Sequence, residues 1–522
     1  MANNLCSSNL TSGFIDLATY DEQEKYLYGG PDSVAYFVRE IRKATWFTQV
    51  PVVLSRSSGQ PGFGQQWSVS ISRAGDYLLQ TWLRLQLNSV AAAVVNPLTG
   101  PDHPFVQGQT YSVLRWTKNF MHNLITECNI SFNDLVAARF DNYHLDFWAA
   151  FTVPSGKRLG YLNMIGSVDP LINPVSVCGF PNGAQNPGAQ ILPQATLNLP
   201  LPFFFTRDTG LALPTAALPY NEMRINFAFQ SWQNLLIQDV YTASGALTGQ
   251  WESKPAPQSA ISGNAEPTLS NVQVWANYAI VSNEERKKMA CAPRDILIEQ
   301  VQTAPIQTFQ PVSNPNPVYD IRFSHAIKAL FWAAQNTTNK SQWSNYTTNC
   351  LVPQGPQSTG PWYNNINGIN LQVQPNIASF GIIQFNAGAD PILNTTIVYE
   401  NTQRLYQMGS DYFSLVNPWY CAPVIPVETG YHLYSYSLDF FCIDPMGSTN
   451  YGKLTNVSIA PIQSADSALV AAPATIPPVA QSVAYGAKFN FITTALNNNI
   501  IRIKIPLVRN RRLLGRVPIN SF

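Results

Sequence analysis

Apolar and polar side chains alternate with a period of two over residues 272–281, which predicts a β-strand. Ser282 and Glu285 then fit a capping box that begins a short helix, with acidic residues in its first turn and lysines near its end. Pro293 excludes a longer helix, and apolar residues within 296–301 begin a second strand. This strand–helix–strand stretch lies just past the middle of the 522 residues. We interpret it as the seam between two halves that are both β.

The same period of two recurs through both halves, with turn residues between the runs. It predicts strands over residues 67–72, 77–87, 123–132, 199–205, 219–229, 319–323, 327–333 and 431–442. The strands at 319–323 and 327–333 are predicted to pair around Ser324 and His325. A last hairpin is predicted over residues 489–505, because Asn497, Asn498 and Asn499 tolerate the positive φ of a tight turn.

Residues 133–151 depart from this pattern. Their apolar positions recur at roughly helical spacing, as at Leu135, Ala138, Tyr143, Phe147 and Ala150, which predicts one helix or two short ones. Residues 235–269, 336–390 and 461–481 are rich in polar residues or proline and predict long loops. The predicted organisation is an N-terminal arm (1–28), a first β domain (29–290), a second β domain with a long loop at 336–390 (291–508), and a basic tail (509–522).

The composition changes this picture in one respect. Charged residues make up only 12% of the chain, aromatic residues another 12%, and the net charge is +1. So few charges favour extensive burial between subunits over an isolated soluble monomer. The near-zero net charge indicates no general affinity for nucleic acid, and we expect no specific nucleic-acid binding.

No catalytic, metal-binding or cofactor-binding residues are predicted. The nearest thing to a metal or acid–base cluster is His144 with Asp141 and Asp146, and we interpret these three as solvated or hydrogen-bonded polar residues of a helix. His325 beside Ser324 lacks an orienting carboxylate at a recognisable spacing. Paired carboxylates for sugar hydrolysis are not excluded, but no pair stands out.

Two other groups of residues are candidate sites. The sequons at Asn336, Asn339, Asn345 and Asn394 are candidate glycosylation sites, although an asparagine-rich segment also produces such triplets by chance. The cluster formed by Arg509, Arg511, Arg512 and Arg516 is a candidate contact for an inward-facing partner, and the alternative is a solvated tail.

The N-terminal sequence has no basic region followed by an apolar run, so it does not resemble a signal peptide. No uninterrupted apolar run reaches the length of about 18 residues that a bilayer span needs. The seven cysteines are scattered and predicted to be reduced. We therefore expect synthesis in a cytosol-like compartment.

Ten segments in conserved order along the chain resemble the major capsid proteins of large icosahedral double-stranded DNA viruses, most closely those of iridoviruses. They are residues 11–19 (TSGFIDLAT), 44–51 (ATWFTQVP), 70–77 (SISRAGDY), 120–125 (FMHNLI), 131–138 (SFNDLVAA), 199–205 (LPLPFFF), 218–225 (LPYNEMRI), 272–303, 412–420 (YFSLVNPWY) and 444–454 (DPMGSTNYGKL). The resemblance is weakest in residues 235–269, 336–390 and 461–481 and in the basic tail.

The resemblance implies an all-β fold of two tandem eight-stranded jelly rolls with short helices in the connections. It also implies a homotrimer that forms a pseudo-hexameric capsomer, contacts between neighbouring capsomers, and an icosahedral outer shell assembled in the host cytoplasm. Residues 336–390 would form an outward tower, and residues 235–269 are a second candidate. The arm would face minor capsid proteins and the inner viral membrane. The alternative is a carbohydrate-binding or glycan-processing jelly-roll protein, which an aromatic-lined groove with paired carboxylates would favour.

Overall fold

The computed structural model describes residues 3–39, 41–93, 110–172, 191–218, 221–243, 249–291, 294–348, 389–471 and 486–503. The chain divides into two compact units, Met1–Trp46 and Phe47–Phe522. The first unit contains helices α1 (Asn3–Ala18) and α2 (Glu22–Leu27). The Asp21 side chain caps α2 by accepting a hydrogen bond from the backbone N–H of Glu22 at 2.7 Å. The basic tail and most of residues 336–390 lie outside the described residues.

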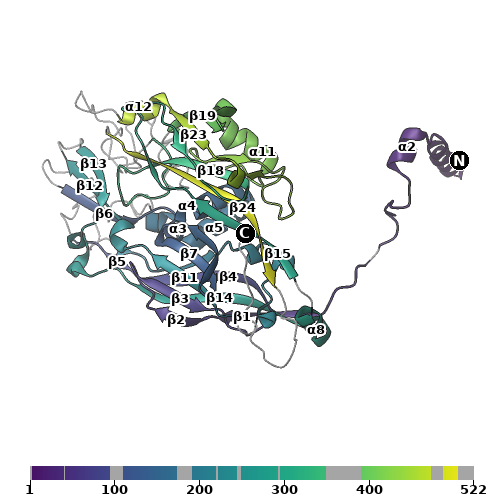
Figure 1. Ribbon diagram of the computed structural model, residues 1–522, viewed down its shortest axis with the longest axis horizontal. Coiled ribbons are helices and arrows are strands. Elements are labelled where there is room, and N and C mark those ends of the chain that lie inside the picture. Colours follow the sequence, from purple (N-terminus) through teal and green to yellow (C-terminus); the bar gives the residue numbers. More distant parts are fainter. Residues whose placement is uncertain are drawn as a thin grey trace. The chain divides into compact units, whose positions relative to one another are not determined.

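The first half of the second unit is a sandwich of two antiparallel sheets, which we call the first sandwich (Figure 1). One sheet has the order β1 (Phe47–Val53), β14 (Leu269–Val281), β4 (Tyr77–Leu87), β10 (Ala195–Pro200). The other has the order β2 (Ser55–Gly59), β3 (Gln66–Ser70), β11 (Met223–Phe229), β7 (Ile125–Phe132), β8 (Leu135–Asp141). Smaller sheets join β13 (Gly249–Pro255), β12 (Leu236–Ala243) and β6 (Thr110–Trp116), and also β5 (Val90–Ala91) and β9 (Ile191–Leu192).

The alternation seen in the sequence decides which side chains fill this sandwich. On β11 the four large apolar side chains are buried, and Arg224, Asn226 and Ala228 between them are partly exposed. Phe227 pairs with Trp67 on β3, and their rings stack with centroids 5.4 Å apart. Side chains of both sheets meet in one core, as a period-two pattern with one covered face requires.

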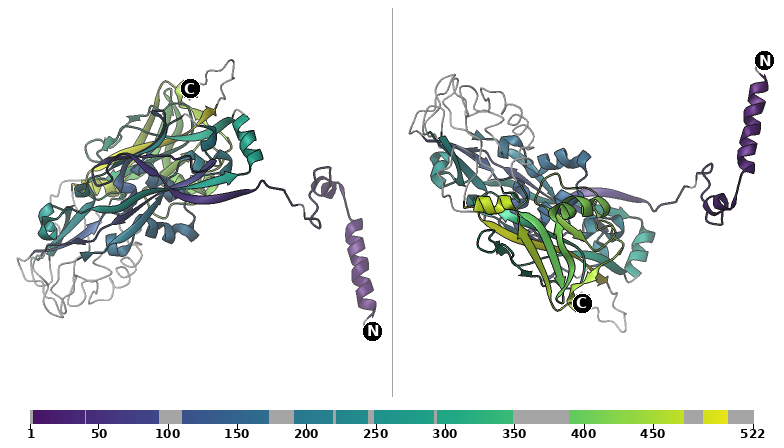
Figure 2. Two further views of the ribbon diagram at one scale, coloured as in Figure 1. Left: turned by 90° about the horizontal axis from the view of Figure 1, so that it is seen from below. Right: turned by 90° about the horizontal axis from the view of Figure 1, so that it is seen from above.

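The second half forms a second sandwich. Its larger sheet has the order β15 (Arg294–Thr303), β24 (Phe489–Ile503), β18 (Ala326–Asn336), β21 (His432–Ser435), with β16 (Gln307–Phe309) on β24 and β22 (Thr449–Asn450) on β18. The smaller sheet has the order β17 (Tyr319–Asp320), β23 (Val457–Gln463), β19 (Ile392–Tyr399), β20 (Thr402–Gly409). The second sandwich, whose later strands are green to yellow, lies against the first (Figure 2).

The helices of the second unit lie in connections between strands. They are α3 (Phe120–Leu124), α4 (Asn142–Thr152), α5 (Ser155–Ile165), α6 (Asp169–Ile172), α8 (Asn283–Cys291), α11 (Asn417–Cys421) and α12 (Ala465–Ala471), with a π-helix, η7 (Tyr412–Val416), leading into α11. Short 3-10 turns occur at Phe204–Thr206, Thr209–Leu211, Thr215–Ala217, Trp232–Asn234, Gln258–Ala260, Ser262–Asn264 and Tyr451–Lys453. None of the helices in the described parts of the chain is long and apolar enough to cross a bilayer.

The predicted strand–helix–strand stretch is present as β14, α8 and β15. Strand β14 ends at Val281 and α8 begins at Asn283, on either side of Ser282. Asp76 holds this junction, because its carboxylate accepts from the Val281 N–H at 3.0 Å and from the Arg286 guanidinium at 2.8 and 2.9 Å. Burial raises the pKa of Asp76, but these donors outweigh burial and leave the pKa below its usual value.

Several expectations about secondary structure were wrong. In the predicted strand at 199–205 only Leu199 and Pro200 are strand, and in the predicted strand at 431–442 only His432–Ser435 is strand. The predicted loop at 461–481 contains helix α12. Residues 135–141, predicted to be helical, form strand β8, and only Asn142–Thr152 is helix. Residues 235–269, predicted to be a loop, contain the β12–β13 hairpin. The two strands expected to pair around His325 lie in different sheets, β17 on β23 and β18 on β24.

The predicted final hairpin is instead the single 15-residue strand β24. It is paired with β15 on one side and β18 on the other, so Asn497 lies inside a sheet. The Asn497 carboxamide oxygen accepts from Gln302 Nε2 at 2.8 Å. Pairing with a strand on each side gives the backbone N–H and C=O groups hydrogen-bond partners that a turn would not provide.

Candidate functional site

The candidate functional site is the seam between the two sandwiches, and helix α4 lies at its centre. Phe147 and Phe151 of α4 pack on Phe331 of β18, with ring centroids 5.8 and 5.6 Å apart. Tyr431 and Phe440 of the second sandwich belong to the same buried cluster. A helix of the first sandwich is thus covered by the sheet of the second, which explains why it is apolar around most of its circumference.

A polar network lies beside this apolar contact and is centred on Asp146, whose side chain is fully buried. Within the first sandwich, its carboxylate accepts from Asn119 Nδ2 at 3.0 Å and pairs with His122 Nδ1 at 2.7 Å. From the second half of the chain, it accepts from the hydroxyls of Ser344 at 2.6 Å and Tyr346 at 3.0 Å. One carboxylate therefore connects the two sandwiches, and four partners offset the cost of burying it.

The first turn of α4 makes a second connection. Asp141 caps the helix by accepting from the His144 N–H at 2.8 Å, and its other oxygen accepts from the Thr303 hydroxyl of β15 at 2.7 Å. Burial raises the pKa of Asp141 and lowers the pKa of His144 to about 3. His144 is therefore a neutral, buried residue at physiological pH, and it belongs to the packing of the seam.

A third connection is an ionic cluster around Glu299 of β15. Glu299 forms ion pairs with Arg207, from the first sandwich, and with Lys328 of β18, whose Nζ lies 2.7 Å from Glu299 Oε1. The Arg207 guanidinium also lies over two neighbouring rings, 4.8 Å from the centroids of Trp148 and Phe441. Burial lowers the pKa of Arg207 to about 10, which leaves it charged at physiological pH.

Residues 336–348, predicted to begin a long surface loop, belong instead to the seam. The indole N–H of Trp343 donates to the Asn234 carbonyl at 2.8 Å, and the Ser341 hydroxyl donates to the Gln233 carbonyl at 3.0 Å. This segment lies against the first sandwich and brings Ser344 and Tyr346 to Asp146. Within the predicted tower, most of residues 336–348 are buried, although Thr338 and Lys340 are exposed. Residues 349–388 lie outside the described residues.

The sequons of this segment are buried as well. The exposed fractions of Asn336, Asn339 and Asn345 are 2%, 7% and 2%. In each case the carboxamide oxygen accepts from the backbone N–H two residues later at 3.1 Å, which is an Asx turn. A sugar on any of these three would have to displace seam contacts. Asn394 is half-buried on β19, and glycosylation there stays a prediction.

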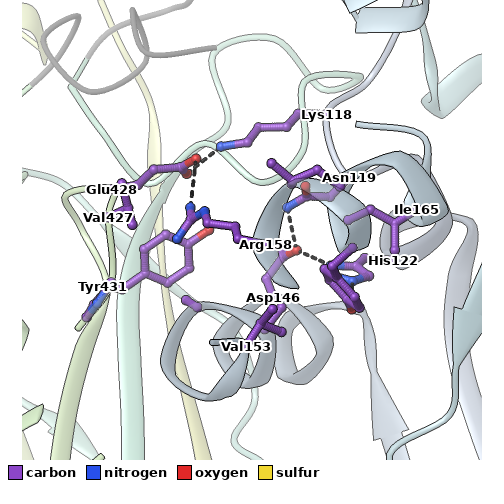
Figure 3. A pocket seen from close by; sticks show the side chains of 15 residues that line it. Lys118, Asn119, His122, Asp146, Val153, Arg158, Ile165, Val427, Glu428 and Tyr431 are labelled. Carbon is purple, nitrogen blue, oxygen red and sulfur yellow. Dashed lines mark hydrogen bonds and ion pairs between the residues drawn. The ribbon is translucent and has the colours of Figure 1, made fainter. Parts of the chain in front are cut away.

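A pocket opens at the edge of the seam, between α4, α5 and residues 426–431 (Figure 3). Two carboxylates and two tyrosines line it, the combination that the glycan-processing alternative requires. However, Asp146 is fully buried and engaged by four partners, and Glu428 forms an ion pair with Lys118. Both carboxylates are thus engaged by neighbouring side chains, which does not favour the glycan-processing alternative.

The arginines at 509, 511, 512 and 516 lie outside the described residues. Within the described ranges, no group of three or more His, Cys, Asp or Glu side chains could hold a metal ion. Sequence reasoning missed Asp146 as a connection between the halves. The available signal was a carboxylate within the otherwise apolar run 145–151 of this helix.

Solved structures with this architecture are capsid proteins. A chain of the PBCV-1 virus capsid matches with a TM-score of 0.62 and 20% identity, covering 90% of this chain and 97% of that chain. The Faustovirus major capsid protein matches with a TM-score of 0.61 and 13% identity, covering 96% and 98%. The fold is therefore the double jelly roll of viral major capsid proteins, and the two sandwiches are its two rolls.

Sequence comparison identifies the family. Residues 35–281 match the family described as major capsid protein N-terminus, and residues 285–506 match the large eukaryotic DNA virus major capsid protein. The major capsid protein of Simulium iridescent virus is 57% identical, covering 98% of both chains. That of Lymphocystis disease virus 1 (isolate Darai) is 44% identical, covering 96% of this chain and 97% of the relative. The chain belongs to the family of large eukaryotic DNA virus major capsid proteins, which confirms the resemblance to iridovirus proteins.

Proposed function

We propose that this protein forms a homotrimer, and that this trimer is the pseudo-hexameric capsomer of an icosahedral outer shell. Membership of the family establishes a structural role in a capsid. The trimer, the tiling of capsomers and the absence of any enzymatic activity are part of the proposal. The virion is the site of action, and assembly takes place in the host cytoplasm.

The observation that carries the proposal is the seam. Two sandwiches joined by an apolar helix contact, a buried carboxylate network and an ionic cluster behave as one block with two similar walls. Three such blocks around a threefold axis present six similar walls, as a hexagonal tile requires. The low charge of the chain lets these walls meet at small desolvation cost.

The N-terminal unit provides a second part of the proposal, a contact with minor capsid proteins and the inner viral membrane. Leu10, Phe14 and Leu17 of α1 follow a helical spacing of four and three residues and are 65%, 64% and 74% exposed. An apolar stripe of this kind fits a protein groove or a lipid surface. The basic tail at 509–522 is proposed to contribute a similar inward contact.

The mass of the native protein tests the main proposal. Sedimentation velocity of the purified chain should give the mass of three chains, and negative-stain images should show particles with a hexagonal outline and threefold symmetry. A stable monomer that is retained on sugar columns would contradict the proposal. Removing residues 509–522 tests the tail separately, because shells that assemble normally without it would exclude a role in inward contacts.

A further inference from the structure

Helix η7 and helix α11 form one continuous helical segment with apolar side chains on both of its faces. Phe413 and Asn417 face inward, and the Phe413 ring lies 4.7 Å from the ring of Trp332. The opposite face carries Leu415, Val416, Trp419 and Tyr420, which are 50%, 42%, 70% and 76% exposed. We call these four residues the α11 surface (α11 is labelled in Figure 1).

Spacing makes the α11 surface a single patch. Leu415 and Trp419, and Val416 and Tyr420, are each four residues apart, so they stack on adjacent turns of the helix. A helix with large apolar side chains on two opposite faces is normally covered on both. The four side chains expose roughly 500 Å², which is more than half of what one partner contributes to a stable interface.

The surrounding chemistry fits a protein partner. Between residues 405 and 427 Asp411 is the only charged residue, so covering this region requires little desolvation of charge. Exposed Trp and Tyr are the side chains that most often anchor protein interfaces. A surface of this size, with so few charges, does not attract phosphate groups or nucleic acid.

We propose that the α11 surface is covered by a second copy of this chain, namely by the first sandwich of the next copy in the trimer. This inference rests on the proposed homotrimer. A closed ring of three identical chains has heterologous contacts, in which a surface on one copy meets a different surface on the next. With two sandwiches per copy, the rolls alternate around the ring. The second sandwich, which bears the α11 surface, therefore meets a first sandwich.

Substitution of the two aromatic anchors tests this contact. The variants are Trp419→Ser and Tyr420→Ser, singly and together, and the control is Val318→Ser, which removes another apolar side chain, 65% exposed and outside the patch. Sedimentation velocity should show association weakened by about thirtyfold for each lost anchor, while the control remains trimeric. Unchanged far-UV circular dichroism confirms that the variants fold.

A second measurement reports the burial of Trp419 directly, in chains that keep this side chain. Hydroxyl-radical oxidation of Trp419 should be at least about tenfold slower in the wild-type trimer than in a Tyr420→Asp monomer, because the partner excludes solvent. Variants that remain trimeric, or a Trp419 that reacts equally fast in both forms, overturn the inference. The inference is also overturned if the variants lose only capsomer–capsomer assembly or only the binding of another protein. A wild-type chain that is itself monomeric would instead overturn the proposed function.

Discussion

Replacing Asp146 tests whether the buried network joins the two sandwiches. Asp146→Ala removes the acceptor for Asn119, His122, Ser344 and Tyr346 and leaves these donors buried. Loss of one partner from a buried charged network typically costs about 3–5 kcal/mol of unfolding free energy. We expect a loss in that range, since buried donors without acceptors cost about 1–3 kcal/mol each and are not additive.

The isosteric change Asp146→Asn separates the network from its charge. Its carboxamide oxygen can accept from Asn119 and His122, and its amide can donate to the hydroxyl oxygens of Ser344 and Tyr346, which reorient. Every partner is then retained, but the hydrogen bonds become neutral, so the expected cost is about 1–2 kcal/mol. The exposed change Asp134→Asn is the matched control and should lie within about 0.5 kcal/mol of wild type.

Urea denaturation at one fixed protein concentration measures these differences, with circular dichroism and tryptophan fluorescence as separate probes. For Asp146→Ala the two probes should also stop coinciding, because the sandwiches are then coupled more weakly, by the apolar and ionic contacts that remain. Equal stability of the Ala and Asn variants, or an Ala variant within about 1 kcal/mol of wild type, would refute the reasoning.

Three further changes address other parts of the seam and the fold. His144 has a pKa of about 3 in the folded chain, so its contribution to stability is fully present above its ordinary pKa of about 6.5. The free energy of unfolding should fall by up to about 1.4 kcal/mol per pH unit as pH drops from 6.5 towards 3. The variant His144→Phe should flatten this part of the plot of stability against pH, and an unchanged slope counts against a neutral buried imidazole. Asp76→Ala leaves the Val281 N–H without its acceptor and should cost about 1–3 kcal/mol at pH 7. Because the pKa of Asp76 is lowered in the folded chain, the stability difference between wild type and Asp76→Ala should shrink as pH falls through that pKa. A stability difference that stays constant in acid would exclude the ion pair. Gly430 has φ +94° and a Cβ there would overlap the Tyr346 carbonyl oxygen, so Gly430→Ala should lower the melting temperature in a thermal scan by several degrees, and an unchanged value would contradict the geometry.

Local pattern was enough to predict the class of fold and many of its strands. A period of two decides which side chains of β4 and β11 face a core, because successive Cβ atoms point to opposite faces of a strand. The β14–α8 boundary at Ser282 was likewise readable, since a cap and a helix start depend on neighbours within one turn. Both features depend only on residues nearby in the sequence, so they do not change with the position of the strand in the fold.

Pairing partners were not readable in this way. Three consecutive asparagines predict a turn at residues 497–499, yet strands β15 and β18, about 170–200 positions earlier, pair with that segment and keep it extended. Residues 336–348 are polar enough to predict a surface loop, but their amides and hydroxyls are satisfied inside the seam. Polarity predicts exposure only when no buried partner is available.

The sequence by itself determined that this chain is made of two halves rich in alternating strands, with a cap-defined helix between them and few charged residues. Only the tertiary structure decided that α4 lies between the sandwiches and that Asp146 joins them. The reason is that the donors to Asp146 come from residues 24 to 200 positions away, and such contacts leave no periodic signal in the chain.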